Sequence, residues 1–209
     1  MTERLNGNNY SIDMYLFEDG CLPQLTSERQ IGYDVFARAI ISPTDKDPDN
    51  PACCKTIFDF NHIPGDASSQ SHIEYIDRGL GMELAWRIDR WDRALVGIGF
   101  AISSPNNNRQ FNDAFYLISP RRGLASMYGI TIANDPGTTD VDHSAEAEVL
   151  LINNGVDPFY VTKHARIAQL IFGNALKPEF NIVTELQDLG KRQQPAGGFG
   201  NHRSDDRYE

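Results

Sequence analysis

The 209-residue sequence lacks the features that mark several protein classes. Its three cysteines, Cys21, Cys53 and Cys54, are odd in number and form no Cys-x-x-Cys pair, so neither a disulfide framework nor a cysteine-based zinc site is indicated. Its apolar runs are too short to cross a bilayer, and its first residues do not resemble a secretory signal peptide. We therefore expect a protein of the reducing cytoplasm that makes no contact with membranes.

Basic residues are also scarce, because 19 Lys and Arg face 29 Asp and Glu, for a formal net charge of −10. A nucleic-acid partner is not expected, since such binding needs a broad basic surface that displaces counterions. A small anionic ligand remains compatible with this charge if a few arginines reverse the local field. The composition, with 40% hydrophobic and 23% charged residues, is ordinary for a globular domain with a substantial core.

Long amphipathic helices are missing as well, and most of the apolar pattern has a period of two. Residues 82–88 and 96–102 alternate in this way, the second with glycine and alanine on the other face. Short β-branched and aromatic runs between Asn-, Gly- and Pro-rich turns predict further strands at 115–118, 148–152, 159–162, 167–172 and 180–186. A helical turn is expected at Leu124–Tyr128. The pattern predicts an all-β sandwich or jelly roll.

Two segments interrupt this pattern. Residues 42–78, rich in Pro, Asp, Ser and His, are interpreted as an insertion with room for a hairpin. Their aromatic and acidic residues make the insertion a candidate surface for a protein partner. Residues 191–209 are Gly-rich and polar, which predicts a flexible tail after a single domain of residues 1–190.

Five short segments, in the same order along the chain, resemble the motifs of the homotrimeric dUTPase family. They are Ile31-Gly-Tyr-Asp34-Val-Phe-Ala, Ser119-Pro-Arg121-Arg122-Gly123-Leu-Ala, Asn134-Asp-Pro-Gly137-Thr138-Thr-Asp140-Val-Asp142-His143-Ser-Ala-Glu146, Arg166-Ile-Ala-Gln169-Leu-Ile-Phe and Gly197-Gly198-Phe199-Gly. The resemblance implies a distorted jelly roll of the dUTPase-like β-clip type and a homotrimer whose active sites are built from more than one subunit. It also implies Mg²⁺-dependent hydrolysis of dUTP to dUMP and pyrophosphate.

The resemblance assigns roles to the acidic residues of these motifs. Asp140, after its Pro-Gly turn, corresponds to the catalytic carboxylate that activates water. Asp34 would hold the magnesium ion through water together with the Gln169 amide, since Mg²⁺ prefers oxygen ligands and keeps its waters. From the residues alone, Asp34 could equally form an ion pair with Arg166, and Asp140 could be an ordinary turn residue.

The remaining motif residues would bind the nucleotide. The predicted substrate-binding set is Arg121, Arg122, Gly123, Asn134, Gly137, Thr138, Asp140, His143, Arg166, Gln169, Gly198 and Phe199. Arginines would contact the phosphates, although Arg121 could instead join subunits. The turn at Asn134 would select uracil over cytosine through its pattern of donors and acceptors, and Phe199 would stack over the base.

Several motif positions differ from the family pattern. His143 stands where the family has tyrosine, Arg122 where it has serine and Gln194 where it has arginine. Asn201 and His202 replace Ser-Thr in the tail. Because the resemblance implies that these positions contact the sugar and the phosphates, we expect altered or weakened binding of the triphosphate.

Two other functions stay open at the level of sequence. A dCTP deaminase shares the implied fold, but Leu150 occupies the place of its catalytic glutamate, which leaves only Glu146 and Glu148 nearby. The second alternative is a catalytically weak, nucleotide-binding regulatory relative that acts through the insertion at residues 42–78.

Overall fold

The computed structural model describes residues 12–62, 71–79, 81–103, 114–140, 145–176, 178–180, 182 and 185. The chain divides into a compact unit, Met1–Leu176, and a second unit, Lys177–Glu209. The predicted boundary near residue 190 stays a prediction. Cys21, Cys53 and Cys54 are free thiols. Among the described residues, no helix is both long and apolar enough to cross a membrane.

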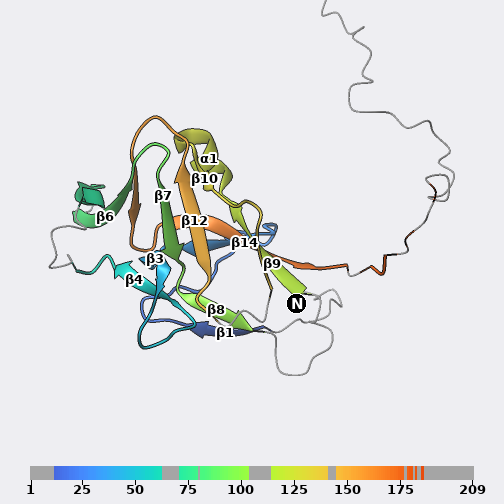
Figure 1. Cartoon of the computed structure of the whole chain (residues 1–209). Helices are drawn as coiled ribbons and strands as arrows, with labels where there is room; N and C mark the ends of the chain where they lie inside the picture. The colour runs from blue at the N-terminus through green and yellow to red at the C-terminus, as the bar shows by residue number, and fades with distance from the viewer. Residues whose placement is uncertain are drawn as a thin grey trace, which may run out of the picture. The chain divides into compact units, whose positions relative to one another are not determined.

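Antiparallel strands build the first unit (Figure 1). A five-stranded sheet has the order β10 (Ile130–Ile132), β12 (Glu148–Asn153), β7 (Arg93–Gly97), β3 (Ala39–Lys46) and β4 (Cys54–Phe58). A four-stranded sheet has the order β11 (Gly137–Asp140), β9 (Ala114–Pro120), β14 (Arg166–Asn174) and β2 (Tyr33–Phe36). Two smaller sheets join β13 (Phe159–Thr162), β6 (Met82–Ile88) and β5 (Ile73–Asp77), and β1 (Asp13–Leu16) with β8 (Phe100–Ser103). The prediction of an all-β fold is confirmed.

The period-two pattern is met most clearly in β12, where alternate side chains enter the hydrophobic core. In β12, Val149 and Leu151 are buried, whereas Glu148, Leu150 and Ile152, which alternate with them, are partly exposed. Tyr116, Phe58 and Phe100 are the bulkiest side chains of the core. Each fully buried apolar side chain stabilises the fold by about 1.5–3 kcal/mol, so the alternation fixes which face of each strand points inward.

Two predictions about single strands need correction. The alternation at residues 96–102 divides into β7 and β8, which lie in different sheets, because Gly99 has a φ of +79° and turns the chain. The strand predicted at 180–186 is wrong for residues 180, 182 and 185, which lie outside any strand. Phe180 and Ile182 are 89% and 90% exposed. Alternating apolar residues form a stable strand only beside a partner strand.

The predicted helix and the segment at residues 42–78 are both present as regular structure. The helix α1 (Arg122–Tyr128) begins two residues before the predicted turn and ends at Gly129, whose φ is +71°. Within the segment at 42–78, the end of β3 and β4 form the expected hairpin, with Lys46 opposite Cys54. The apolar stretch in β5 pairs instead with β6, outside the segment. This segment therefore adds strands to sheets that the rest of the chain begins.

Candidate functional site

Asp34 is the centre of a charged cluster on the four-stranded sheet. Its side chain is 2% exposed, and the register of β2 with β14 places Gln169 directly opposite it. The Gln169 amide donates to Asp34 Oδ1 at 3.2 Å. Arg121 Nε lies 3.3 Å from Oδ1, and Arg166 Nη1 lies 3.4 Å from Oδ2. A buried carboxylate needs such partners, so the predicted pair with Arg166 is present, together with a second arginine.

The two arginines of this cluster remain accessible to a ligand. The Arg121 side chain is 26% exposed and that of Arg166 is 49% exposed. Their contacts of 3.3–3.4 Å with Asp34 are longer than the 2.7–2.9 Å typical of charge-assisted hydrogen bonds. Arg121 Nη1 also donates to the Arg166 carbonyl oxygen at 3.0 Å, which fixes the end of β9 against β14. The cluster therefore combines a buried anion with two cations at the surface.

Arg122 and Gly123 follow immediately, in the first turn of α1. Both are exposed, and Arg121 is the residue that caps the helix. The Arg121 carbonyl oxygen accepts a hydrogen bond from the Ala125 backbone N–H at 3.1 Å, so the helix orients Arg121 as it leaves β9. Arg121 contacts Arg166 directly, through the hydrogen bond from its side chain to the Arg166 carbonyl oxygen.

The turn between β10 and β11, two strands that lie in different sheets, carries the second group of predicted residues. Gly137 is buried, whereas Asn134 and Thr138 are exposed at and after the turn. A Cβ added at Gly137 would lie 3.5 Å from Ile118 and 3.6 Å from Asn134 Nδ2, so the turn packs closely on β9. Asp140 ends β11 with its Cα opposite Phe115 of β9. His143, Gly198 and Phe199 lie outside the described residues, as do Gln194, Asn201 and His202.

A buried tyrosine supports the strand that carries Asp140. Tyr116 is 1% exposed and lies opposite Thr139 in the register of β9 with β11. Burial raises the pKa of the Tyr116 hydroxyl, and its hydrogen bond with Thr139 offsets part of that increase. The polar side chain of Thr139 therefore has a polar partner on the neighbouring strand.

The register separates the two groups of predicted residues within one chain. Asp34 is opposite Gln169, and Gln169 is opposite Ser119 of β9, whereas Asp140 is opposite Phe115. With about 3.3 Å per residue and about 4.8 Å between strands, Asp140 is roughly 13 Å along and roughly 14 Å across the sheet from Asp34. Within one chain, an active site that used both carboxylates would therefore have to span roughly 20 Å.

Sequence reasoning named Glu146 but missed that it is a second buried carboxylate, 3% exposed, with an arginine partner. Arg38 binds it in a fork, with Nε 2.7 Å from Oε1 and Nη2 2.6 Å from Oε2. The Gly99 backbone N–H also donates to Oε1 at 2.8 Å. Burial alone would lower the pKa of the Arg38 guanidinium, but the hydrogen bond and the charge of Glu146 outweigh it and raise the pKa above its ordinary value. Arg38 and Glu146 are 108 residues apart, so no local sequence signal could have paired them.

Comparisons with known proteins identify related sequences. The dUTPase family model matches residues 113–202. Over 108 residues the chain is 41% identical to the deoxyuridine 5'-triphosphate nucleotidohydrolase of Rhizobium rhizogenes, covering 52% of this chain and 64% of that protein. Over 109 residues it is 42% identical to the enzyme of the same name from Nautilia profundicola, covering 52% of this chain and 70% of that protein. The match thus spans about two thirds of each relative's length.

Solved structures show the same fold. The dUTPase of Staphylococcus bacteriophage 80alpha with dUpNHpp has a TM-score of 0.58 at 15% identity, over 91% of this chain and 96% of that chain. A mutant dUTPase from phage phi11 of S. aureus, described with a structural Mg(II) ion, has a TM-score of 0.55 at 13% identity, over 84% of this chain and 98% of that chain. The architecture is therefore the all-β fold of dUTPases. Because of the identity to the curated relatives, we conclude that the chain belongs to the dUTPase family.

Proposed function

We propose that the protein hydrolyses dUTP to dUMP and pyrophosphate in a Mg²⁺-dependent reaction. The observation that carries this proposal is the cluster in which buried Asp34 joins Arg121, Arg166 and Gln169. These residues come from two separate motifs of the family plus the aspartate of a third, and the fold brings them into contact. The curated relatives with which the chain shares over 40% identity are deoxyuridine 5'-triphosphate nucleotidohydrolases.

The arginines would bind the phosphates despite the net charge of −10. At an effective dielectric constant near 20, two opposite charges about 4 Å apart attract by roughly 4 kcal/mol before desolvation. Arg121 and Arg166 are half-exposed and Arg122 is exposed, so all three can turn toward an anion. Arg122, in place of the serine of the family pattern, adds a third cation to this surface.

The donor set of the cluster fits a hydrated magnesium ion. Asp34 and Gln169 offer the oxygen atoms that Mg²⁺ prefers. Both Asp34 oxygens already face arginine or amide donors, so the fit is to the waters around the ion and not to direct ligation. When bound, the ion would neutralise phosphate charge. Asp34 and Gln169 would orient those waters.

Asp140 would act as the general base that takes a proton from the attacking water. The turn at Asn134 and Thr138 would hold the base and sugar, with Gly137 keeping it close to β9. His143 and Phe199 would contact the deoxyribose and the base. Because Asp140 and Asp34 are roughly 20 Å apart in one chain by the sheet spacings, a second chain must supply one of them, which supports a homotrimer with shared sites.

The contacts of Glu146 argue against the deaminase alternative, in which Glu146 and Glu148 are the two candidate catalytic glutamates. Glu146 is buried and engaged by Arg38 and by the Gly99 N–H, so it has no position from which to shuttle a proton to a substrate. Leu150, in the place of the deaminase glutamate, lies in the middle of β12. Glu148 lies at the start of the same strand, beside Cys54.

A nucleotide panel tests the proposal. The purified protein with Mg²⁺ is given each dNTP and NTP, and pyrophosphate and ammonia are both measured. We expect pyrophosphate from dUTP above all other nucleotides and no ammonia from dCTP. Ammonia from dCTP would support the deaminase, and tight nucleotide binding without turnover would support the regulatory relative acting through residues 42–78.

The shared site has a separate test. Two chains, one with Asp140→Asn and one with Arg166→Ala, are co-expressed so that they assemble together, with each variant alone as the control. If every site takes these residues from different chains, random mixing leaves about a quarter of the sites with both native residues, and activity returns toward that fraction. A mixture no more active than the separate variants would show that one chain holds the whole site.

A further inference from the structure

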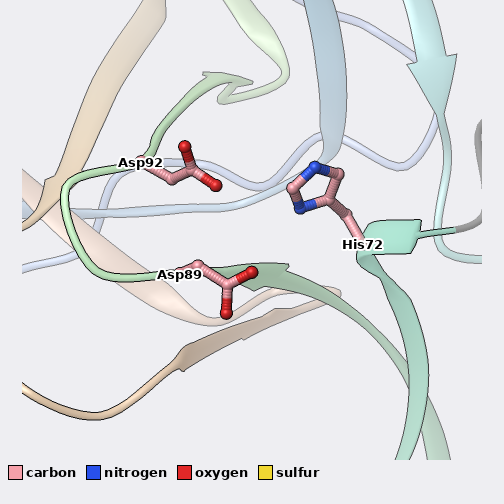
Figure 2. Close-up of side chains that lie close together, drawn as sticks. All are labelled: His72, Asp89 and Asp92. Carbon is pink, nitrogen blue, oxygen red and sulfur yellow. The ribbon is translucent and has the colours of Figure 1, made fainter.

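A second group of potential ligands lies at the turn between β6 and β7, away from the Asp34 cluster. His72 directly precedes β5, Asp89 follows β6, and Asp92 precedes β7. One ligand atom from each of these residues lies within 4.8 Å of the other two. Figure 2 shows the imidazole and the two carboxylates directed toward a common space. Neither the family motifs nor the proposed reaction uses any of the three.

The hydrogen bond of His72 sets the tautomer and the orientation of its imidazole ring. His72 Nδ1 lies 3.0 Å from the Arg87 carbonyl oxygen. A carbonyl oxygen can only accept, so Nδ1 carries the hydrogen and Nε2 keeps a free lone pair. The ring also stacks on Trp86, with centroids 5.2 Å apart and planes at 16°. Metal-ligating histidines commonly donate their other ring nitrogen to a carbonyl or carboxylate, which fixes tautomer and orientation.

The turn that carries the carboxylates is held from a neighbouring strand. Asn153 is fully buried, and its side-chain amide donates to the carbonyl oxygens of Ile88 and Asp157, both at 2.9 Å. The Trp91 backbone N–H donates to the Asn153 carbonyl, and the Asn153 N–H donates to the Asp92 carbonyl, at 2.7 and 3.1 Å. The backbone on both sides of the cluster is therefore fixed, while the exposed Asp92 side chain can adjust.

The charge of the cluster favours a cation. Asp89 Oδ2 accepts from Arg87 at 3.0 Å, which leaves its other oxygen available, and Arg87 is shared with Glu74 at 2.5 Å. Two carboxylates, Glu74 and Asp89, thus share one guanidinium, and Asp92 adds a further negative charge beside Asp89. A divalent ion between His72, Asp89 and Asp92 would offset the excess negative charge.

We propose that His72, Asp89 and Asp92 bind one zinc ion. One imidazole nitrogen with two carboxylate oxygens is a donor set suited to Zn²⁺, whereas Mg²⁺ is bound through oxygen alone. Around Zn²⁺ at about 2.1 Å, tetrahedral ligand atoms are roughly 3.4 Å apart, so the cluster must contract on binding, chiefly by rotation of Asp92. The ion would join residues 71–78, the end of the predicted insertion, to the β6–β7 turn. This site is independent of the proposed hydrolysis.

Metal titration of the full chain without nucleotide tests the site. The protein is freed of metal by a chelator, and Zn²⁺ or Mg²⁺ alone is added while heat of binding and melting temperature are recorded. We expect one Zn²⁺ per chain, a higher melting temperature with Zn²⁺ and no equivalent response to Mg²⁺. Asp92→Asn should weaken Zn²⁺ affinity at least about tenfold. Asp49→Asn, which removes the same charge from an exposed loop, should not. Equal affinity in Asp92→Asn and the unmodified protein would overturn the proposal.

The location of the ion needs its own measurement, because the free cysteines and the other histidines can also bind zinc. Nitrogen-15 spectra of the imidazole side chains identify His72 by comparison with His72→Gln. We expect Zn²⁺ to shift the Nε2 signal of His72 at one equivalent. A shift confined to other histidines, or zinc binding lost on blocking the thiols while His72 is unchanged, would place the ion elsewhere and refute the site. The melting temperature of metal-free Asp92→Asn, compared with that of the metal-free unmodified protein, confirms that the variant is folded.

Discussion

Asp34 and Glu146 are both buried carboxylates that pair with arginine, yet the two sites are built differently. Glu146 accepts hydrogen bonds from Nε and Nη2 of Arg38 at 2.7 and 2.6 Å and from the Gly99 backbone N–H at 2.8 Å. Asp34 meets its arginines at 3.3–3.4 Å, and those arginines are 26% and 49% exposed. Both sites satisfy a buried charge, but only the second leaves its cations within reach of a ligand.

This difference separates a structural carboxylate from a candidate functional one. A closed fork such as Arg38–Glu146 connects the chain after β2 to the segment before β12, and Gly97 makes room for it: a Cβ there would lie 2.6 Å from Glu146 Oε1. In the Asp34 cluster the contacts are long and both arginines are partly exposed to solvent. These arginines can therefore shift toward a bound ion or phosphate while Asp34 stays buried.

Removal of Glu146 should cause the largest loss of stability. Glu146→Ala leaves the Arg38 guanidinium without its partner, and breaking a buried ion pair costs about 3–5 kcal/mol. The free energy of unfolding in urea, measured at one fixed protein concentration, gives this value. The control is Glu74→Ala, whose pair with Arg87 is about one third exposed and, being solvated, should change the free energy of unfolding far less. Equal losses would mean that the Arg38–Glu146 fork has no special structural role.

Asp34→Asn should affect stability less and metal dependence more. The exposed fractions of Arg121 and Arg166 allow water to solvate both cations, so we expect a loss of about 1 kcal/mol or less in the same urea experiment. The Mg²⁺ concentration that gives half-maximal dUTP turnover should rise several-fold, since Asp34 would hold the waters of the ion. A loss of stability as large as that of Glu146→Ala, with unchanged Mg²⁺ dependence, would make Asp34 a structural residue.

Much of the fold followed from the sequence because strands that are buried on one face leave a period of two. This pattern located β6, β12 and β13, and the turn residues located α1 within two positions. It did not reveal that Gly99 divides residues 96–102 between two sheets, since that depends on backbone packing. It also predicted a strand at 180–186, where apolar alternation lacks a partner strand in the described residues.

The site was predictable where motif residues are adjacent in the sheet. Asp34, Arg166 and Gln169 come together because β2 and β14 are neighbours, and Arg121 joins them from the end of β9. The Arg38–Glu146 pair and the ligand group at His72 were not predictable, because each depends on long-range contacts between residues that are ordinary in isolation. The roles of His143 and Phe199 stay predictions.

The central claim is that Asp140 performs the chemistry of dUTP hydrolysis. The most direct test compares the unmodified protein with Asp140→Asn in single-turnover release of pyrophosphate from dUTP with Mg²⁺, alongside binding of a non-hydrolysable dUTP analogue by calorimetry. We predict that the variant loses about 10³-fold in rate, within the range of a lost general base, while its affinity for the analogue stays within a few-fold. A variant that retains the rate of the unmodified protein would contradict the account.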